Sequence, residues 1–569
     1  MTKTTITADV CKSSTNNISV PLGLIDAVQG YLRILGLSKY LDTLKTKGIS
    51  MASLTAILIS YGLSDDNSME ACAKWLRDYR IRRPFGIKDN VSQRTLNRAL
   101  QILGRNREGI IVALYDGLCN LYPDLNKDTD ADGSSIAMNS EGNLSKHGHP
   151  RDNNPDGLQT EFMLGMFEDS RIPFYIHEYA GNISDEEQFA RSVPEMMGLI
   201  DHGDIDAYRK ISDKLVSNIR LRNKERELRK IEKKKGKRGR RKKIAVESEE
   251  DVNKTALLEL NRALGNVTWV IFDNGGASVY NTDAITEMGH EYLTRKDMNK
   301  TDLELTKRTE PVRVEPGLVC WADTFESSGR TKYIFRADYL ADAKASAAER
   351  KVERMAETAR ALKNGEIDPM SLVDVKTNEF IDFDVKVSVQ QILTEYTEDE
   401  KKALVEKYKG RYCGFFHLES SAPLTPLEAI RKYRKRIAIE HAIRSLKNVA
   451  GIKPMRVWDD DSITGRMVLA LLAEAVMSII RYEYPEDYVT VTRKGVTVTK
   501  SHKPDNKSLC RILSQLTATF YLDEKRRSRV VISGSTKESI GIFERLEAKM
   551  SDPGTIESYI SPHPTASAA

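Results

Sequence analysis

The sequence predicts a multidomain α/β protein whose N-terminal part is helical. Residues 20–120 place apolar side chains at helical spacing, with plausible capping residues before them. Residues 125–200 change to three strand-like segments, SSIAM, QTEFMLGMF and PFYIHEYAG, separated by polar turns. Further along, NVTWVIFDNGG is a short, nearly continuous apolar run of the kind found in buried parallel strands.

The composition indicates a soluble intracellular protein. The chain has 569 residues, of which 40% are hydrophobic and 30% charged, as expected of globular domains. Six cysteines are widely scattered without a C-x-x-C pair, which favours a reducing compartment and argues against a zinc site. The longest apolar run, at 467–480, contains Glu474 and is too short to span a bilayer. We therefore expect a buried helix there, no membrane partner, no signal peptide and a cytoplasmic location.

One predicted N-terminal helix presents a polar face of the kind that can bind DNA. Ser68 is a plausible cap for an earlier helix, and Ser92 for the segment that comes after it. From Ser92 on, helical spacing turns Leu96, Leu100 and Leu103 inward. It leaves four polar residues outward: Gln93, Arg94, Asn97 and Arg98. Such side chains at a helix N-terminus suit a helix-turn-helix recognition helix, although an ordinary surface helix has the same pattern.

The elements after residue 184 alternate in type. Helical patterns cover about 185–200 and 341–363. Residues 317–340 predict a hairpin that turns around 327–329, and 411–420 predict another strand. The final residues, SPHPTASAA, have the composition of a disordered tail.

Positive charge is concentrated in one block. The whole chain has a net charge of +5, yet residues 220–243 contain fifteen Lys or Arg against three Glu, a net of +12. The rest of the chain therefore sums to −7. Such blocks often bind nucleic acid, but a solvated insertion without a partner has the same composition. Gly236 and Gly239 favour a flexible arm over a packed element.

The segment YRKRIAIEHAIRSLK, at 433–447, places one carboxylate among cations. On a single helix, four residues fall within a wedge of about 60°: Tyr433, Arg436, Glu440 and Lys447. An apolar stripe lies beside them, so the helix can pack on a core and still present this polar face. The plain alternative is a set of i, i+4 ion pairs between Glu440 and Arg436 or Arg444 on a solvated face.

This spacing, Y-x2-R-x3-E-x6-K, resembles the signature of DDE transposases of the insertion-sequence-four type. Neighbouring segments also resemble that family: LTPLEAIRKYRKRIAIE before the last acid, VIFDNGGAS around the second, and DGSSIAM around the first. GNISD, at 181–185, resembles a loop found between the first two acids. The resemblance extends over about residues 90–482.

The resemblance implies an RNase H-like mixed-sheet core with a helical DNA-binding domain before it and a β-rich insertion before the last catalytic residue. The first boundaries expected on this basis are a helical DNA-binding domain at 1–124, a first core part at 125–203 and a basic insertion, helical or flexible, at 204–261. A second core part at 262–300, a β-rich insertion at 301–424, core helices at 425–482 and a C-terminal region with a disordered tail at 483–569 follow.

The same resemblance implies a metal-dependent site. Asp132, Asp273 and Glu440 would be the catalytic acids and would bind two Mg²⁺ ions, with Mn²⁺ as a substitute. Among the crowded acids Asp128, Asp130 and Asp132, only the last is followed by the Ser134–Ser135 pair and a strand. Tyr433, Arg436 and Lys447 would contact the DNA backbone. Carboxylates suit this chemistry because Mg²⁺ prefers oxygen ligands, and two ions can stabilise both attacking and leaving oxygens of a phosphodiester.

The expected function is cut-and-paste transposition of an insertion sequence in the cytoplasm, at the nucleoid. The partners would be double-stranded DNA, as terminal inverted repeats and target, and a second copy of the chain in a paired-end complex. Two alternatives stay open. One is a nuclease or resolvase on the same core, and the other is a transposase-derived DNA-binding protein without catalysis. Trp321 is a candidate to stack on an extruded base, and a core position is the alternative for it.

Overall fold

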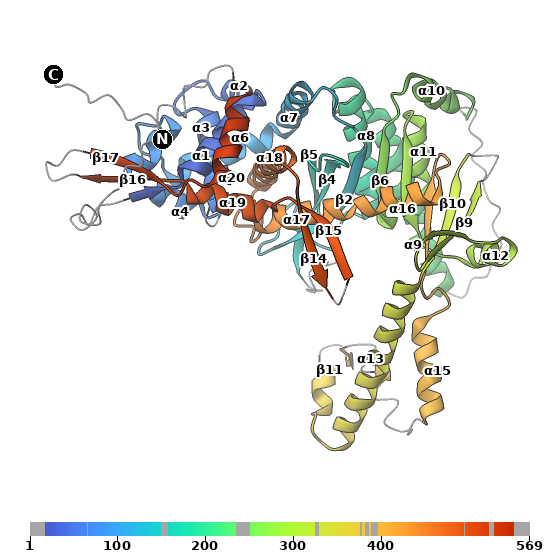
Figure 1. The fold of residues 1–569 in the computed structure, drawn as a ribbon. Coiled ribbons are helices and arrows are strands. Elements are labelled where there is room, and N and C mark those ends of the chain that lie inside the picture. Colours follow the sequence, from blue (N-terminus) through green and yellow to red (C-terminus); the bar gives the residue numbers. More distant parts are fainter. Residues whose placement is uncertain are drawn as a thin grey trace, which may run out of the picture. The chain divides into compact units, whose positions relative to one another are not determined.

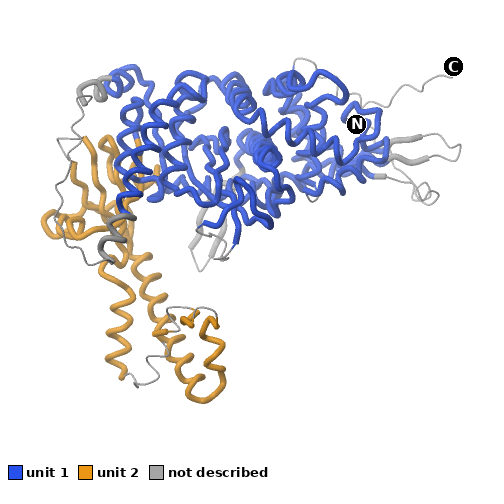
Figure 2. Tube along the Cα trace, turned by 180° about the vertical axis from the view of Figure 1, so that it is seen from behind, with its two compact units in different colours: residues 1–291, 434–569 blue, residues 292–433 orange. Residues whose placement is uncertain are grey.

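The computed structural model describes residues 18–64, 67–148, 157–234, 251–324, 329–375, 378–381, 386–387, 397–493, 496–522 and 528–550. The chain divides into two compact units (Figure 2). Unit 1 comprises Met1–Glu291 and Arg434–Ala569, and unit 2 comprises Tyr292–Tyr433. Unit 2 is therefore an insertion in the sequence of unit 1.

Unit 1 begins with helices, as the sequence predicts (Figure 1). They are α1 (Leu22–Ile34), α2 (Leu37–Thr43), α3 (Met51–Ser64), α4 (Met69–Trp75), α5 (Tyr79–Arg82), the 3₁₀ turn η2 (Arg83–Phe85), α6 (Gln93–Arg105) and α7 (Arg107–Leu121). Both predicted caps form, because the Ser68 hydroxyl accepts from the Ala71 amide and the Ser92 hydroxyl from the Thr95 amide.

A long apolar helix, α18 (Asp460–Glu483), forms the centre of the helical part of unit 1. It packs on α6 at a close crossing, since a Cβ on Gly465 would collide with the Leu100 carbonyl oxygen. Its length and composition are those of a membrane span, but its most apolar 18-residue window is 100% buried inside the protein. The predicted buried helix at 467–480 is confirmed, and the helix is longer than its apolar run.

The predicted strands form one mixed sheet in unit 1. Its strands are β2 (Thr129–Met138), β3 (Lys146–His147), β4 (Leu158–Phe167), β5 (Pro173–Ala180) and β6 (Trp269–Phe272). β4 pairs antiparallel with β2, β3 and β5, whereas β6 pairs parallel with β2. A parallel neighbour requires a crossover, and α8 (Asp185–His202), α9 (Arg209–Lys234) and α10 (Asp251–Leu264) lie in the connection between β5 and β6.

The basic block is helical where the structure describes it. Residues 220–234 belong to α9, and Arg220 and Arg222 pair with Glu187 and Glu186 of α8. Residues 235–243 lie outside the described residues. The helical part of the predicted helical or flexible insertion is therefore present, and the flexible arm expected around Gly236 and Gly239 lies outside the described residues.

The segment 433–447 is two helices, not the single helix that the sequence predicts. α16 (Pro426–Lys435) ends one residue before Arg436, and α17 (Ile437–Asn448) starts one residue after it. Arg436 forms a turn at the junction. No proline or glycine lies between 427 and 448, so nothing local signals this break.

The remainder of unit 1 includes C-terminal strands, one of which pairs with an N-terminal strand. It contains β14 (Asp487–Arg493), β15 (Val496–His502), α19 (Asn506–Gln515), β16 (Thr517–Leu522), β17 (Ser528–Ser533) and α20 (Lys537–Glu547). β16 pairs with β17 and with the N-terminal strand β1 (Ile18–Val20). The predicted disordered tail lies outside the described residues.

Unit 2 combines strands with long helices. Its strands pair in the order β7 (Glu291–Lys296), β13 (Phe415–Ser420), β10 (Thr331–Ala337), β9 (Leu318–Thr324) and β8 (Val312–Glu315). Its other elements are α12 (Lys300–Arg308), α13 (Asp338–Lys363), η4 (Pro369–Leu372), the short strands β11 (Val373–Asp374) and β12 (Glu379–Phe380), and α15 (Glu398–Lys409). The predicted hairpin, helix and strand are confirmed, but the insertion is mixed α/β in place of β-rich.

Trp321 is part of the core of unit 2. Its side chain is 8% exposed, its indole N–H donates to the Thr309 carbonyl at 3.0 Å, and its ring packs against Phe415. The structure thus places Trp321 in the alternative, structural position.

Candidate active site

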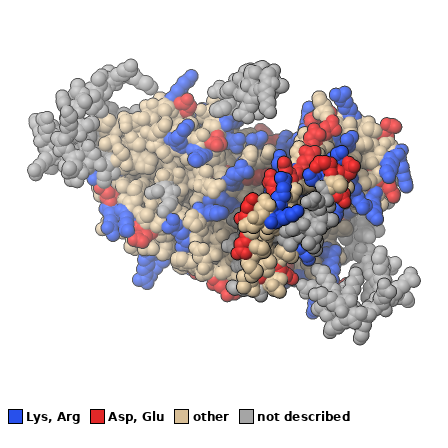
Figure 3. Space-filling model, turned by 90° about the horizontal axis from the view of Figure 1, so that it is seen from below, with Lys and Arg blue, Asp and Glu red and all other residues tan. Residues whose placement is uncertain are grey.

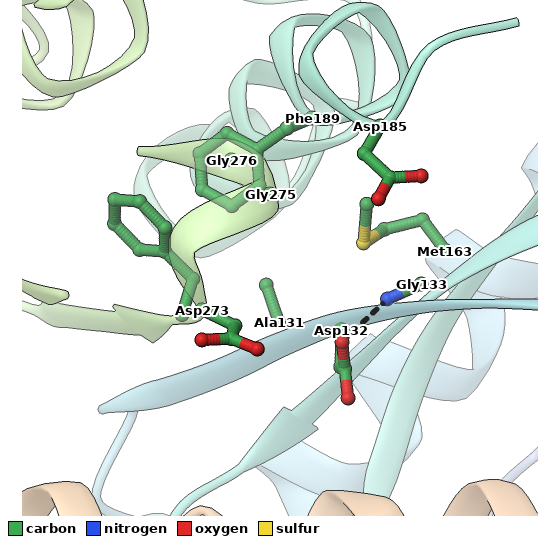
Figure 4. Close-up of a pocket in the computed structure, with 10 residues that line it drawn as sticks. Ala131, Asp132, Gly133, Met163, Asp185, Phe189, Asp273, Gly275 and Gly276 are labelled. Atoms are coloured by element: carbon green, nitrogen blue, oxygen red, sulfur yellow. Dashed lines mark hydrogen bonds between the residues drawn. The ribbon is translucent and has the colours of Figure 1, made fainter. Parts of the chain in front are cut away.

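Two of the three predicted acids lie side by side at one cavity in unit 1. The parallel register pairs Asp130 with Ile271 and Ala131 with Phe272, so the next residues on the two strands are Asp132 and Asp273. Both line a cavity of about 260 Å³ (Figure 4). In open α/β sheets, ligands bind at the carboxyl ends of such parallel strands, and Asp273 directly follows the end of β6.

Backbone amides hold both carboxylates. Asp132 Oδ1 accepts from the Gly133 amide at 2.9 Å, and Asp273 Oδ1 accepts from the Asn274 amide at 2.7 Å. Asp273 is the N-cap of a 3₁₀ turn, η3 (Asn274–Gly276). Gly276 must lack a side chain here, because a Cβ would lie 2.6 Å from the Phe189 ring of α8. The two glycines after Asp273 thus bring α8 against the cavity.

The neighbouring acids on β2 have other positions. Asp130 is fully buried. Asp128 Oδ1 accepts from the Trp269 amide at the start of β6. Of the three acids that crowd this stretch, Asp132 is the one that lines the cavity.

Asp185 is a third carboxylate at the cavity, which the sequence did not single out as a site residue. It is the first residue of α8 and projects from the side opposite β2 (Figure 4). A Cβ on Gly275 would lie 3.0 Å from Asp185 Oδ2, which shows how closely the carboxylate approaches the turn after Asp273. The signal was present in GNISD, where Ser184 caps α8 and sets Asp185 in the first turn.

Glu440 is connected to Asp132 at this cavity by contacts of both residues with Arg436. The Arg436 guanidinium lies 2.9 Å from Asp132 Oδ1 and 3.8 Å from Glu440 Oε1. The Arg436 side chain is 7% exposed, whereas that of Glu440 is 55% exposed. Over the described ranges, no three His, Cys, Asp or Glu side chains lie close enough together to hold a metal ion. In this arrangement Arg436, not a third carboxylate, is the neighbour of Asp132.

The cavity is lined by both acidic and apolar side chains. Its charged lining residues are Asp132, Asp185 and Asp273, and Met163, Phe189 and Phe272 supply apolar surface. Three carboxylates that line one cavity make its interior negative, and a bound cation would balance that charge. The donor set offers only carboxylate oxygen, which suits Mg²⁺ or Mn²⁺ better than a metal that prefers nitrogen or sulfur.

The predicted DNA contacts are only partly exposed. On α6, Gln93, Arg94 and Arg98 are exposed and Asn97 is half-buried, while Leu96, Leu100 and Leu103 are buried as predicted. Tyr433, in unit 2, and Lys447, in unit 1, are half-buried. On the face drawn in Figure 3, Lys and Arg side chains lie interspersed with Asp and Glu.

Comparison with known proteins gives little beyond this geometry. No family model matches the chain, and no curated protein matches its sequence. Among solved structures, the chain is similar to piggyBac transposase in a synaptic complex with hairpin DNA, with a TM-score of 0.34 and 8% identity over 88% of this chain and 80% of that chain. Values this low do not establish a common fold, so a function for this chain has to be inferred from the geometry of the acidic cavity.

Proposed function

We propose that this chain is a DNA transposase with a DDE-type acidic site on an RNase H-like core. The observation that carries the proposal is the pair Asp132 and Asp273 on adjacent parallel strands, open to one acidic cavity. The strand order β5-β4-β2-β6, with three antiparallel strands followed by a parallel one, supports that core.

Asp132, Asp273 and Glu440 would hold the two Mg²⁺ ions, and Asp185 offers a further carboxylate at the same cavity. Bound there, the ions would activate the attacking oxygen and stabilise charge on both oxygens of the scissile phosphodiester. The protein's own contribution is orientation: backbone amides fix Asp132 and Asp273 before any ligand arrives.

Cations on α16 and α17 would position the DNA. Arg436 would hold the Asp132 carboxylate in place through their short contact, and Tyr433 and Lys447 would bind backbone phosphates on either side of Glu440. The exposed face of α6, with Gln93, Arg94, Asn97 and Arg98, would recognise terminal-repeat sequence. A paired-end complex would then bring two copies of the chain to two ends of one element.

Single substitutions at the acids test the proposal. Asp132→Asn, Asp273→Asn and Glu440→Gln should each reduce Mg²⁺-dependent cleavage of terminal-repeat DNA at least about a hundredfold, since even groups that only orient metal ligands contribute that much. DNA affinity should stay near that of the unaltered chain. Glu141→Gln is the matched control, because Glu141 is a surface acid of unit 1 with a 71% exposed side chain. Wild-type cleavage by the Glu440→Gln variant would overturn its assignment.

A second candidate function is a DNA-binding protein without catalysis. It is favoured by the contact of Arg436 with Asp132, together with the lack of any described group of three metal-ligating side chains. Direct titration of Mn²⁺ onto the chain separates the two functions. Saturable binding that Asp273→Asn abolishes supports the enzyme, and no binding supports the second candidate.

A nuclease without strand transfer would cleave terminal DNA but not join it to a target duplex.

A further inference from the structure

A second cavity in unit 1 gathers three cations. It has a volume of about 330 Å³ and lies between the β4–β5 turn, the end of α18 and the segment after β15. Arg171, Arg481 and Lys503 line it, one from each of these places. Buried hydroxyl groups of Ser170 and Ser478 complete the polar lining.

The positive charge in this cavity is only partly balanced by nearby acids. Among the described residues, neither Arg171 nor Arg481 forms an ion pair, and Lys503 donates to the Tyr482 carbonyl at 3.1 Å. Asp169 also lines the cavity, but Lys435 binds its carboxylate at 2.7 Å. Glu486 is the other acid of the lining.

Burial and mutual repulsion make the charged forms of these groups costly. Burial lowers the pKa of Arg481 and the nearby Arg171 lowers it further, while Glu474 and Asp505 oppose that shift. Burial likewise lowers the pKa of Lys503, Glu486 opposes that shift, and Arg481 and Arg171 add to it. An anion placed among the three cations would remove this repulsion and satisfy their donors.

A purely structural role explains only part of the cluster. Arg481 is in the last turn of α18 and Lys503 binds a carbonyl there, and cations are favourable at a helix C-terminus. Arg171 belongs to another element, and its φ of 58° is in the left-handed region, which costs a non-glycine residue about 1–2 kcal/mol. Glycine or asparagine would form this turn with less strain, yet an arginine stands there beside two other cations.

We propose that this cavity binds a phosphate group, supplied by the DNA backbone. The source rests on the proposed function and on the neighbouring segment. Lys435, which pairs with Asp169 of the cavity lining, directly precedes Arg436, which lies 2.9 Å from Asp132 at the acidic site. One short basic segment therefore borders both sites. Guanidinium groups match phosphate oxygens in pairs, so Arg171 and Arg481 would hold the group and Lys503 would add charge.

The first arm of the test uses inorganic phosphate and the full chain. The variant Arg171→Asn with Lys503→Gln removes two charges, and asparagine tolerates the left-handed backbone. The control, Lys401→Gln with Lys402→Gln, removes two charges from α15 in unit 2, where both lysines pair with acids of their own helix. At constant ionic strength, phosphate should raise the Tm of the unaltered chain and of the control more than that of the variant. An equal rise in all three overturns the phosphate site. Lys503→Gln alone is the second variant if the double change unfolds the protein.

The second arm measures affinity for duplex DNA against salt concentration. Loss of one phosphate contact should flatten the slope of log affinity against log salt by about 0.9 in the variant but not in the control. An unchanged slope beside a positive first arm assigns the cavity to a free anion and overturns the assignment to DNA. If the unaltered chain binds DNA but cleaves none, the proposed enzymatic function is wrong. Both arms still test whether the cavity binds phosphate and whether DNA supplies it.

Discussion

Arg436 joins two of the three candidate acids at the scale of single residues. It is nearly buried and lies 2.9 Å from Asp132, while its second contact, to the exposed Glu440, is 3.8 Å long. A buried ion pair loses more when one partner is removed than an exposed pair does, because the remaining charge is left desolvated. The two contacts should therefore differ in energy.

Double-mutant cycles on unfolding free energy check that difference. The coupling between Arg436→Ala and Asp132→Ala should reach about 1–3 kcal/mol, whereas that between Arg436→Ala and Glu440→Ala should stay below about 0.5 kcal/mol. Equal couplings, measured by urea unfolding, would show that the short contact is not the one that holds the α16–α17 junction.

Glu474 should make stability depend on pH. Burial raises its pKa to about 7 from an ordinary 4.5, and Ser445 and Asn506 bind its carboxyl group. The folded protein thus binds a proton that the unfolded chain releases between these pH values. This stabilisation is complete below about pH 4.5, and about 3 kcal/mol is lost as pH rises through 7.

The measurement is urea unfolding at about pH 5 and about pH 8. Glu474→Gln should reduce the difference in unfolding free energy between the two pH values, since glutamine does not titrate, while Glu141→Gln should leave the difference unchanged. The same pH dependence in Glu474→Gln and the unaltered chain would assign the effect to other groups.

At the scale of elements, glycines decide how closely α6 and α18 approach. A Cβ on Gly465 would collide with the Leu100 carbonyl oxygen of α6, and one on Gly104 with the Asp461 carbonyl oxygen of α18. The backbones thus cross in direct contact. Because α6 carries the candidate DNA-binding residues, this crossing also determines their position.

Gly465→Ala should therefore destabilise the protein by about 1–3 kcal/mol, the usual cost of overpacking, and weaken sequence-specific DNA binding. Gly541→Ala on α20 is the matched control. Its new Cβ would meet only the flexible end of Arg545, at 3.3 Å, so helix propensity should stabilise it by up to about 1 kcal/mol. Thermal unfolding of both variants and of the unaltered chain checks this prediction. Equal Tm values for Gly465→Ala and Gly541→Ala would contradict the close crossing of α6 and α18.

At the scale of the whole molecule, the two units differ in how their chain ends meet. In unit 2, the first residue is held by a later segment of the same unit, because the Ser421 amide donates to the Tyr292 carbonyl at 3.2 Å. Its core contains stacked Phe335 and Phe416. The N-terminal helices, by contrast, depend on residues far along the chain: β1 pairs with β16, and α6 packs on α18.

Fragments should behave accordingly. Residues 292–433 alone should fold and unfold cooperatively, whereas residues 1–124 alone should not, because they would expose the apolar faces that α18 and α19 cover in unit 1. Circular dichroism during thermal unfolding checks both fragments. A cooperative transition for 1–124 would show that this segment is an independent domain.

Local patterns in the chain were enough to predict most elements of this protein and one of its candidate acids, while the family resemblance supplied the assignment of Asp132. Helical spacing with Ser92 predicted α6 and its buried leucines, and strand-like segments between polar turns predicted β4 and β5. Asp273 was recognisable at the end of a short apolar strand. These signals are local, because capping and side-chain periodicity depend on residues a few positions apart.

Contacts between distant segments, by contrast, decide what lies beside Arg436 and bring Arg171, Arg481 and Lys503 together. The helix breaks where Arg436 contacts Asp132, roughly three hundred positions away in the chain, and nothing within a few residues of 436 encodes that contact. The three cations come from three separate elements. Periodicity cannot place side chains from distant segments beside one another, because only packing of the whole unit brings them together.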